Sequence, residues 1–222
     1  MAFDLDAHHL HVQEHGERVR YRQGMKCPCG LSEDPTRARP TCKVCQGRGF
    51  RYGPEKSMTA LVTGIQTQKA WLATGMFLPS DLLIGFSPYE RTPVSDWDIF
   101  RLPWSTGLAY EGDLRVRNPD PEEPDFLSYE VQAVHGCFAI DPQDQVVAEY
   151  VLGTDFTITG RSLTWLPSKG PEPRQKYSLK YHAIFDWVAF VSPMQRFDAH
   201  TDIGPRAMLR KYHMAAGQAT PF

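Results

Sequence analysis

The sequence has no uninterrupted apolar run of membrane-spanning length, so we expect no transmembrane helix. It also has no strong charge of either sign. The formal net charge is −2 over 222 residues, which excludes bulk attraction of the whole chain to nucleic acid. The N-terminal residues lack both the basic start and the apolar stretch of a secretory signal. We therefore expect no oxidising compartment and no disulfide framework.

Signatures of catalysis are missing as well. The sequence contains no Gly-x-Ser-x-Gly, no P-loop, no His-Glu-x-x-His and no dinucleotide-binding fingerprint. The acidic pairs Asp96/Asp98 and Asp141/Asp144 could bind a cation or act as acid and base, but their context favours turn formation. His135 and Cys137 would share one face of a strand, and a buried face explains them more simply than a thiol nucleophile. The sequence therefore predicts that the protein is not an enzyme.

Long helices are also disfavoured, because 18 prolines are spread through the chain. Alternating apolar and polar residues instead predict strands, the last of them bending partway. A two-residue hairpin is expected at Gly160-Arg161. The expected strands are 59–67, 81–86, 112–117, 129–138, 146–151, 155–159, 162–166 and 176–191. The fold class expected is mainly β, an antiparallel β-sandwich or barrel. Its expected core includes Leu61, Val116, Val131, Phe156, Ile158, Trp165 and Tyr181.

What the sequence does contain is a cluster of cysteines near its start. Of five cysteines, four form two close pairs, Cys27/Cys29 and Cys42/Cys45, with 12 residues between the pairs. Tetrahedral zinc needs four soft ligands around one point, and two short knuckles supply them. Gly30, Gly47 and Gly49 can take positive φ, which would turn backbone amides toward the sulfurs. We predict a structural Zn²⁺ held by the four thiolates, which leave no open position for substrate.

Two disulfides, free thiols or an iron–sulfur cluster are the alternatives for the same four residues. Cys137 has no cysteine left to pair with and is expected to be a buried apolar residue. Four nearby histidines could also bind metal, although solvation or an interface explains them more simply. They are His8, His9, His11 and His15.

Four segments follow from these patterns. Residues 1–24 are expected to form an N-terminal helix or arm, with a polar helix over 4–22, and residues 25–56 the four-cysteine zinc module. Residues 57–190 are expected to form the β-domain, and residues 191–222 a C-terminal extension. Both ends carry too few apolar side chains to order themselves, so we expect them to order only against neighbouring subunits.

Two stretches resemble head-closure, head-to-tail adaptor and tail-completion proteins of the neck of tailed bacteriophages. One is the cysteine module from Cys27 to Phe50. The other runs from Gly153 to Phe190 and contains the Asp-Phe, hairpin, Trp, Pro and Tyr-Ser-x-x-Tyr succession. Together they cover about 65 residues. The cysteine module is specific as a metal site, and the second stretch is moderately specific for phage connector β-domains.

The resemblance implies a structural virion protein, assembled in the bacterial cytoplasm, that forms a homo-oligomeric ring joining head to tail. It implies contacts with other neck, portal or tail proteins, and passing contact with DNA in the lumen. The alternative is a zinc-stabilised nucleic-acid-binding module whose basic residues contact phosphates. Those residues are Arg18, Arg20, Arg22, Lys26, Arg37, Arg39, Lys43, Arg48 and Arg51.

Overall fold

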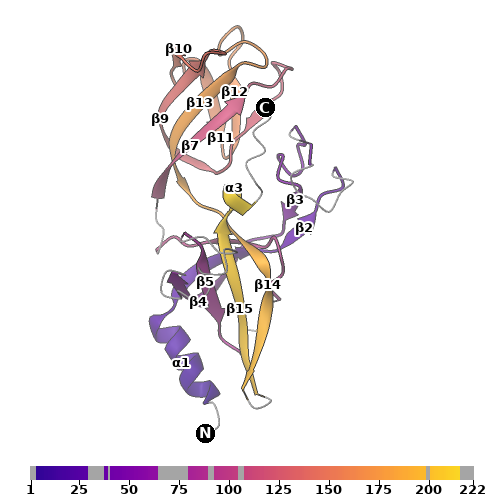
Figure 1. Cartoon of the computed structure of the whole chain (residues 1–222), viewed down its shortest axis with the longest axis vertical. Coiled ribbons are helices and arrows are strands. Elements are labelled where there is room, and N and C mark those ends of the chain that lie inside the picture. Colours follow the sequence, from indigo (N-terminus) through magenta and orange to yellow (C-terminus); the bar gives the residue numbers. More distant parts are fainter. Residues whose placement is uncertain are drawn as a thin grey trace. The chain divides into compact units, whose positions relative to one another are not determined.

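The computed structural model describes residues 4–29, 38–39, 41–64, 80–89, 93–104, 108–198 and 201–215. The protein is mainly β, as the alternation predicts, and its sheets are antiparallel (Figure 1). The chain divides into two compact units. The barrel unit comprises residues 1–25, 52–107 and 186–215, and the sheet unit comprises residues 26–51, 108–185 and 216–222. Each unit is therefore built from segments that are distant in sequence.

The barrel unit holds a closed six-stranded barrel in the order β1-β4-β5-β15-β14-β6. Its strands are β1 (Glu17–Arg22), β4 (Lys56–Gly64), β5 (Leu82–Phe86), β6 (Ile99–Arg101), β14 (Trp187–Asp198) and β15 (Thr201–Lys211). Strand β1 pairs with β4 on one side and with β6 on the other, which closes the ring. The interior is apolar and includes the fully buried Ile84, Phe86 and Phe100. A short helix, α3 (Tyr212–Ala215), follows β15.

The N-terminal segment is half helix and half strand. Helix α1 (Leu5–His15) is capped by Asp4, whose carboxylate accepts a hydrogen bond from the Ala7 amide. The helix expected over 4–22 is right for α1 but wrong for residues 17–22, which form β1. Val19 and Tyr21 are buried at alternate positions, a period-two signal too short to stand out in the sequence. Gly16 permits the change, because a Cβ there would lie 2.3 Å from the Val12 carbonyl oxygen.

The C-terminal segment is not a detached extension. Strand β14 pairs with β6 through Trp187 and Val188, and β15 pairs with β5 through residues 206–209. The described parts of both chain ends therefore find partners within their own chain, and the expectation that they order only on neighbours is wrong for β1, β14 and β15. The expected tail over 216–222 lies outside the described residues.

The far part of the β14–β15 hairpin extends beyond the barrel ladder. Residues 194–198 and 201–205 pair with each other, from Gln195 opposite Pro205 to Asp198 opposite Thr201. Within the described part of the chain, no third strand pairs with them. Figure 1 shows the two strands continuing together as a ribbon. We call residues 194–198 and 201–205 the hairpin arm.

The sheet unit contains a four-stranded sheet and a three-stranded sheet. The larger, in the order β10-β9-β13-β7, consists of β7 (Leu108–Val116), β9 (Val131–Ile140), β10 (Val146–Tyr150) and β13 (Lys176–Ile184). The smaller, in the order β11-β12-β8, consists of β8 (Asp125–Phe126), β11 (Phe156–Thr159) and β12 (Ser162–Trp165). The hairpin expected at Gly160-Arg161 is confirmed, with Thr159 opposite Ser162 and Gly160 at φ +62°.

The single bent strand expected over 176–191 is instead two strands in different sheets. Strand β13 belongs to the sheet unit and β14 to the barrel, and Phe185 and Asp186 separate them. Asp186 is buried and accepts a hydrogen bond from Arg101 Nε at 2.7 Å. Because that partner lies 85 residues away in the chain, the alternation around Asp186 could not reveal the break.

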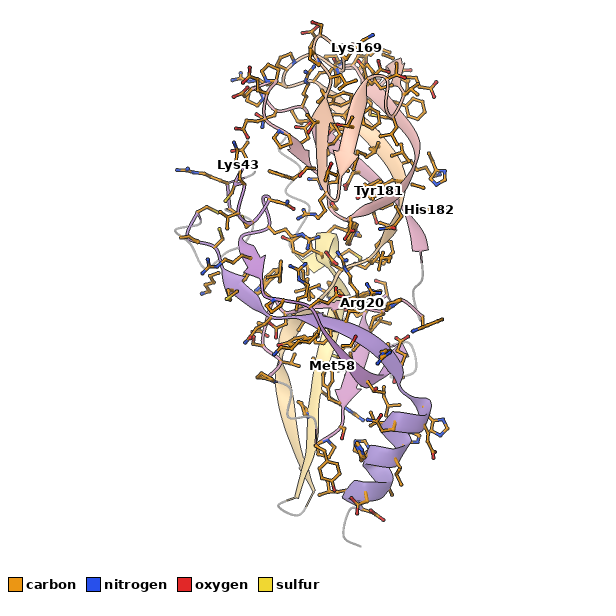
Figure 2. All side chains as sticks on the ribbon, turned by 180° about the vertical axis from the view of Figure 1, so that it is seen from behind. Arg20, Lys43, Met58, Lys169, Tyr181 and His182 are labelled. Atoms are coloured by element: carbon orange, nitrogen blue, oxygen red, sulfur yellow. The ribbon has the colours of Figure 1, made fainter. Side chains whose placement is uncertain are left out.

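The core of the sheet unit mixes aromatic rings with buried carboxylates. Of the core residues predicted in this unit, Phe156, Trp165 and Tyr181 are buried, whereas Val116, Val131 and Ile158 are half-buried. Leu61, predicted as core on β4 of the barrel unit, is also half-buried. Tyr181 and His182 are neighbours on β13, and Tyr181 is buried whereas His182 is only half-buried (Figure 2). Such alternation is what a half-covered antiparallel sheet requires.

A β-bulge separates His135 from Cys137. On β9, Gly136 lies opposite Lys180 and Val134 lies opposite Tyr181, so His135 is the extra residue in the ladder. The expectation that His135 and Cys137 share a buried face is therefore wrong: His135 is exposed, whereas Cys137 is fully buried. Burial raises the pKa of the Cys137 thiol to about 12, so this cysteine is the inert apolar residue expected.

Candidate metal centre

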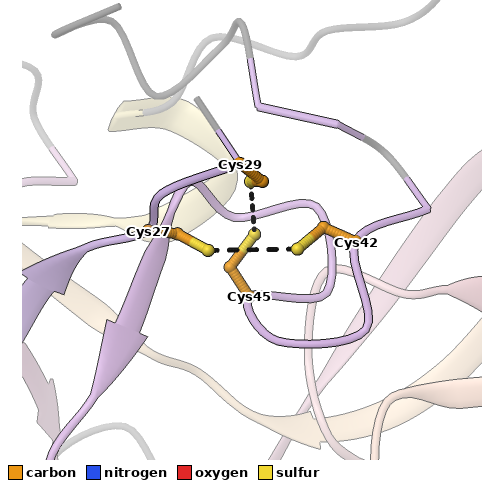
Figure 3. A group of neighbouring side chains, drawn as sticks. All are labelled: Cys27, Cys29, Cys42 and Cys45. Carbon is orange, nitrogen blue, oxygen red and sulfur yellow. Dashed lines mark hydrogen bonds between the residues drawn. The ribbon is translucent and has the colours of Figure 1, made fainter. Parts of the chain in front are cut away.

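The four cysteines predicted as ligands converge on one point. Their Sγ atoms all lie within 4.8 Å of one another, and Figure 3 shows them facing a common centre. The Sγ atoms of Cys27 and Cys42 are 3.9 Å apart, and those of Cys29 and Cys45 are 3.5 Å apart. Four sulfurs around one zinc at about 2.3 Å form a tetrahedron with edges of about 3.8 Å. These two separations are close to that edge, and the four thiols are free rather than joined as disulfides.

Two tight backbone turns place these sulfurs. The two-stranded ribbon of β2 (Gly24–Lys26) and β3 (Phe50–Tyr52) forms the base, and the Cys27 amide donates to the Gly49 carbonyl at 2.8 Å. Around the second pair, the Gln46 amide donates to the Cys42 carbonyl and the Arg48 amide donates to the Cys45 carbonyl. We call residues 26–51 the cysteine clip.

Positive φ angles make the second turn possible. Gly47 and Gly49 both lie at φ +76°, as the sequence predicts, and Gln46 joins them at φ +52°. Gly30, the third glycine expected to act this way, lies outside the described residues. The left-handed conformation of Gln46 could not be predicted from its residue type, since glutamine has no particular preference for that conformation.

Without an ion, the four thiols differ in their readiness to ionise. Burial raises the pKa of Cys45 to about 12 and also raises that of Cys29. In contrast, a hydrogen bond from the Cys45 backbone lowers the pKa of Cys42 to about 7. A bound cation would allow all four to be thiolates together, because its charge offsets their mutual repulsion and their loss of hydration.

The cysteine clip is held by polar contacts to residues between the β-strands of its own unit. Arg48 is buried, and its Nη2 donates to the Ser128 carbonyl oxygen at 2.7 Å. Arg161 Nη1 donates to Gln46 Oε1 at 3.3 Å, and Lys43 Nζ lies 2.9 Å from Glu123 Oε1. Lys43, labelled in Figure 2, is mostly exposed, so its ion pair contributes little. The buried Arg48 is therefore the main polar anchor among these contacts.

Asp113 organises the receiving end of that anchor. Its carboxylate accepts hydrogen bonds from the Ser128 amide at 2.7 Å, the Ser128 hydroxyl at 2.7 Å and the Tyr181 hydroxyl at 2.9 Å. Burial works to raise the pKa of Asp113, but the Arg115 charge and these hydrogen bonds outweigh it and leave the pKa lowered. This network could not be predicted from local sequence patterns, because Asp113, Ser128 and Tyr181 are distant from one another in the chain.

One member of each acidic pair considered for acid–base chemistry has a structural role. Asp141 accepts from the amides of Gln143 and Gln145 and so shapes the turn before β10. Asp98 is buried and accepts from the Ser95 amide and hydroxyl, the Tyr21 hydroxyl and the Gly24 amide. Within the described ranges, no group of three or more metal-binding side chains other than the four cysteines comes together.

Comparison with known proteins adds no family to this picture. No family model matches the chain, and the search of curated proteins finds no match either. Among the described residues, no helix is long and apolar enough to cross a membrane. What the structure shows is a β-rich protein with four cysteines placed so that they could bind a metal ion.

Proposed function

We propose that this chain is a structural subunit that works by assembly, as a ring in the neck of a tailed bacteriophage that joins head to tail. The observation that carries the proposal is the hairpin arm, whose two strands pair only with each other among the described residues. A two-stranded hairpin is marginally stable in water, so a third strand or another surface is needed to hold it. In a ring, the neighbouring subunit supplies that surface.

An exposed apolar strand gives independent support. Strand β10 is an edge of its sheet, and large apolar side chains on it and directly after it are about half or more exposed. They are Val146, Val147, Val151 and Leu152. Monomeric proteins usually protect such an edge with charge, proline or a covering element, so this one is suited to contact another molecule.

A zinc ion in the cysteine clip belongs to the same proposal as a structural element. The sulfur separations fit a single tetrahedral ion, whereas an iron–sulfur cluster would place several atoms between the thiolates and spread them further apart. Four thiolates fill the coordination of such an ion, which suits a structural site rather than hydrolysis.

The experiment is to shorten the hairpin arm. Replacing residues 195–205 with Asn-Gly leaves Met194 opposite Arg206, so the barrel ladder keeps its pairs. We expect the intact chain to form rings in negative-stain images, alone or on a purified portal or tail template, and the shortened chain to remain monomeric with an unchanged circular dichroism spectrum. Rings formed equally well by the shortened chain would contradict the role of the arm.

The nucleic-acid-binding alternative has fewer available cations than its sequence suggests. Arg48 is buried against Ser128, and Arg22 Nε donates to the Gly53 carbonyl. Exposed cations of the clip include Lys26, Arg39 and Arg51. A phosphate-binding role predicts an affinity for DNA that falls steeply as salt rises, which a filter-binding titration would measure.

A further inference from the structure

Two histidines on helix α1 lie at the spacing of a metal chelate. His11 and His15 are four residues apart, so their side chains leave neighbouring turns on the same face of the helix. Their ring centres are 4.6 Å apart with an angle of 52° between the ring planes. Both side chains are exposed, His15 by 61%. The buried Val12 and the hydrogen bond between His9 Nδ1 and Ser87 Oγ, at 2.8 Å, mark the face of α1 that packs on the barrel unit.

The ring separation agrees with shared coordination of one ion. Two imidazoles bound at about 2.1 Å, with an angle of roughly 90° to 110° at the ion, place their ring centres about 4.5 to 5.3 Å apart. The observed 4.6 Å lies in that range. The pair therefore needs little rearrangement of the helix to hold an ion.

We propose that His11 and His15 form a second metal site, which takes a divalent late first-row ion such as Ni²⁺, Cu²⁺ or Zn²⁺. Neutral imidazole suits these ions, whereas Mg²⁺ and Ca²⁺ prefer oxygen ligands. Glu14, whose Oε2 lies 4.0 Å from His15 Nε2, adds a negative charge beside the site. Unlike the cysteine clip, a two-histidine site leaves positions for water or for a ligand from another molecule, so its ion exchanges readily. This inference does not depend on the proposed assembly function.

A second histidine pair in the protein provides the matched control. His135 on β9 and His182 on β13 have ring centres 4.5 Å apart, but they meet edge to face at 78°. His182 is half-buried, unlike the two exposed histidines of α1. Both residues also interact with other groups. This pair should not chelate, although its rings are as close.

The test uses the full-length chain without an affinity tag, with the cysteine clip first loaded with Zn²⁺. Isothermal titration with Ni²⁺ should reveal about one further ion per chain without release of the bound Zn²⁺, which a chromogenic zinc indicator monitors. His11→Gln and His15→Gln should each weaken Ni²⁺ binding by about tenfold or more, because a chelate loses its second ligand. His135→Gln should leave the binding unchanged.

Three results would overturn the proposal. They are the absence of a second binding event, a Ni²⁺ signal that tracks zinc release, and a signal that survives in both helix variants. Because both histidines are exposed, the variants should keep the circular dichroism spectrum and unfolding midpoint of the parent chain. A variant that changed either would be replaced by His15→Asn, with the same expected loss of binding.

Discussion

At the residue scale, a buried arginine anchors the cysteine clip through a hydrogen bond to the rest of its unit. The charged side chain of Arg48 is buried, and its Nη2 donates a hydrogen bond to the Ser128 carbonyl oxygen. The Ser128 amide and hydroxyl are fixed in turn by Asp113. A buried cation without such partners would be strongly destabilising, so the position of Arg48 depends on the strands that surround it.

We therefore expect Arg48→Met to lower the free energy of unfolding by about 2 kcal/mol, the scale of one hydrogen bond made by a charged donor. Methionine keeps most of the aliphatic length while removing the donors. Urea unfolding followed by tryptophan fluorescence measures the effect. The control is Arg51→Met, since Arg51 is exposed in the same clip and its loss should change little. Equal effects of the two substitutions would show that Arg48 is no anchor.

The lowered pKa of Asp113 predicts that the stability of the protein depends on pH. Its pKa in the folded protein lies below the ordinary 3.8, so its charge contributes stability that is present above pH 3.8 and is lost as the pH falls through the folded pKa. Asp113→Asn should destabilise the protein by about 1–3 kcal/mol at pH 7, through loss of charge-assisted hydrogen bonds. The difference in free energy of unfolding between the variant and the parent chain should be smaller at pH 3 than at pH 7.

Urea titrations at the two pH values provide the measurement, with Glu149→Gln as the control because Glu149 is an exposed carboxylate of the same unit. A gap that stays constant between pH 7 and pH 3 would mean that the Asp113 charge has no part in the stability.

At the element scale, the described residues of the cysteine clip contribute only a small core of their own. Its buried apolar cluster consists of Cys27, Ala38 and Cys45, with Cys29 and Cys42 packed against it. So few apolar atoms cannot offset the conformational entropy lost on ordering the clip. A bound ion would supply the missing free energy, as it does in other small four-cysteine modules.

Removal of a ligand should therefore remove both the metal and the order of the clip. We expect elemental analysis to find about one zinc per chain, and Cys42→Ser to lower that content strongly. Cys137→Ala is the control, because Cys137 is a buried cysteine outside the cluster and should leave the zinc content unchanged. Limited proteolysis should cut the clip faster in Cys42→Ser. A metal-free parent chain that resists proteolysis equally would disprove a structural ion.

The clip also shows which features a sequence can predict. The convergence of the four cysteines was predictable, because their spacing is local and thiolates have few other reasons to cluster. The strands β4, β5 and β9 to β12 were predictable for the same reason, since alternation is a local pattern. The sequence suggested Arg48 as a phosphate-contacting residue, but its side chain is buried. The anchoring role of Arg48 depends on Ser128, 80 residues away. The bulge at His135 and the break at Asp186 likewise depend on residues distant in the chain, so local sequence patterns could not predict them.

At the scale of the whole molecule, the described residues of each unit include one feature suited to contact with another molecule. The barrel unit has the hairpin arm, and the sheet unit has the apolar edge strand β10. Each feature is costly in an isolated chain, one through a marginal hairpin and the other through exposed apolar area. Their presence together in one chain is the basis of the proposed closed assembly, in which a heterologous contact would join two different surfaces of the same molecule.

The last prediction follows from the proposed neck-ring function and concerns particle assembly in a tailed phage whose genome contains this sequence. A nonsense mutation in its gene should yield full heads and complete tails that remain unjoined, because a missing ring leaves no surface on which the two can dock. Electron microscopy of the lysate counts joined and separate particles, and the purified intact protein added to the extract should restore joining and plaque formation. The chain with residues 195–205 replaced by Asn-Gly should restore neither, because it keeps the barrel ladder but lacks the hairpin arm. Joined, infectious particles made without the protein would disprove the assembly role. Nucleic-acid binding would then be the next hypothesis to test.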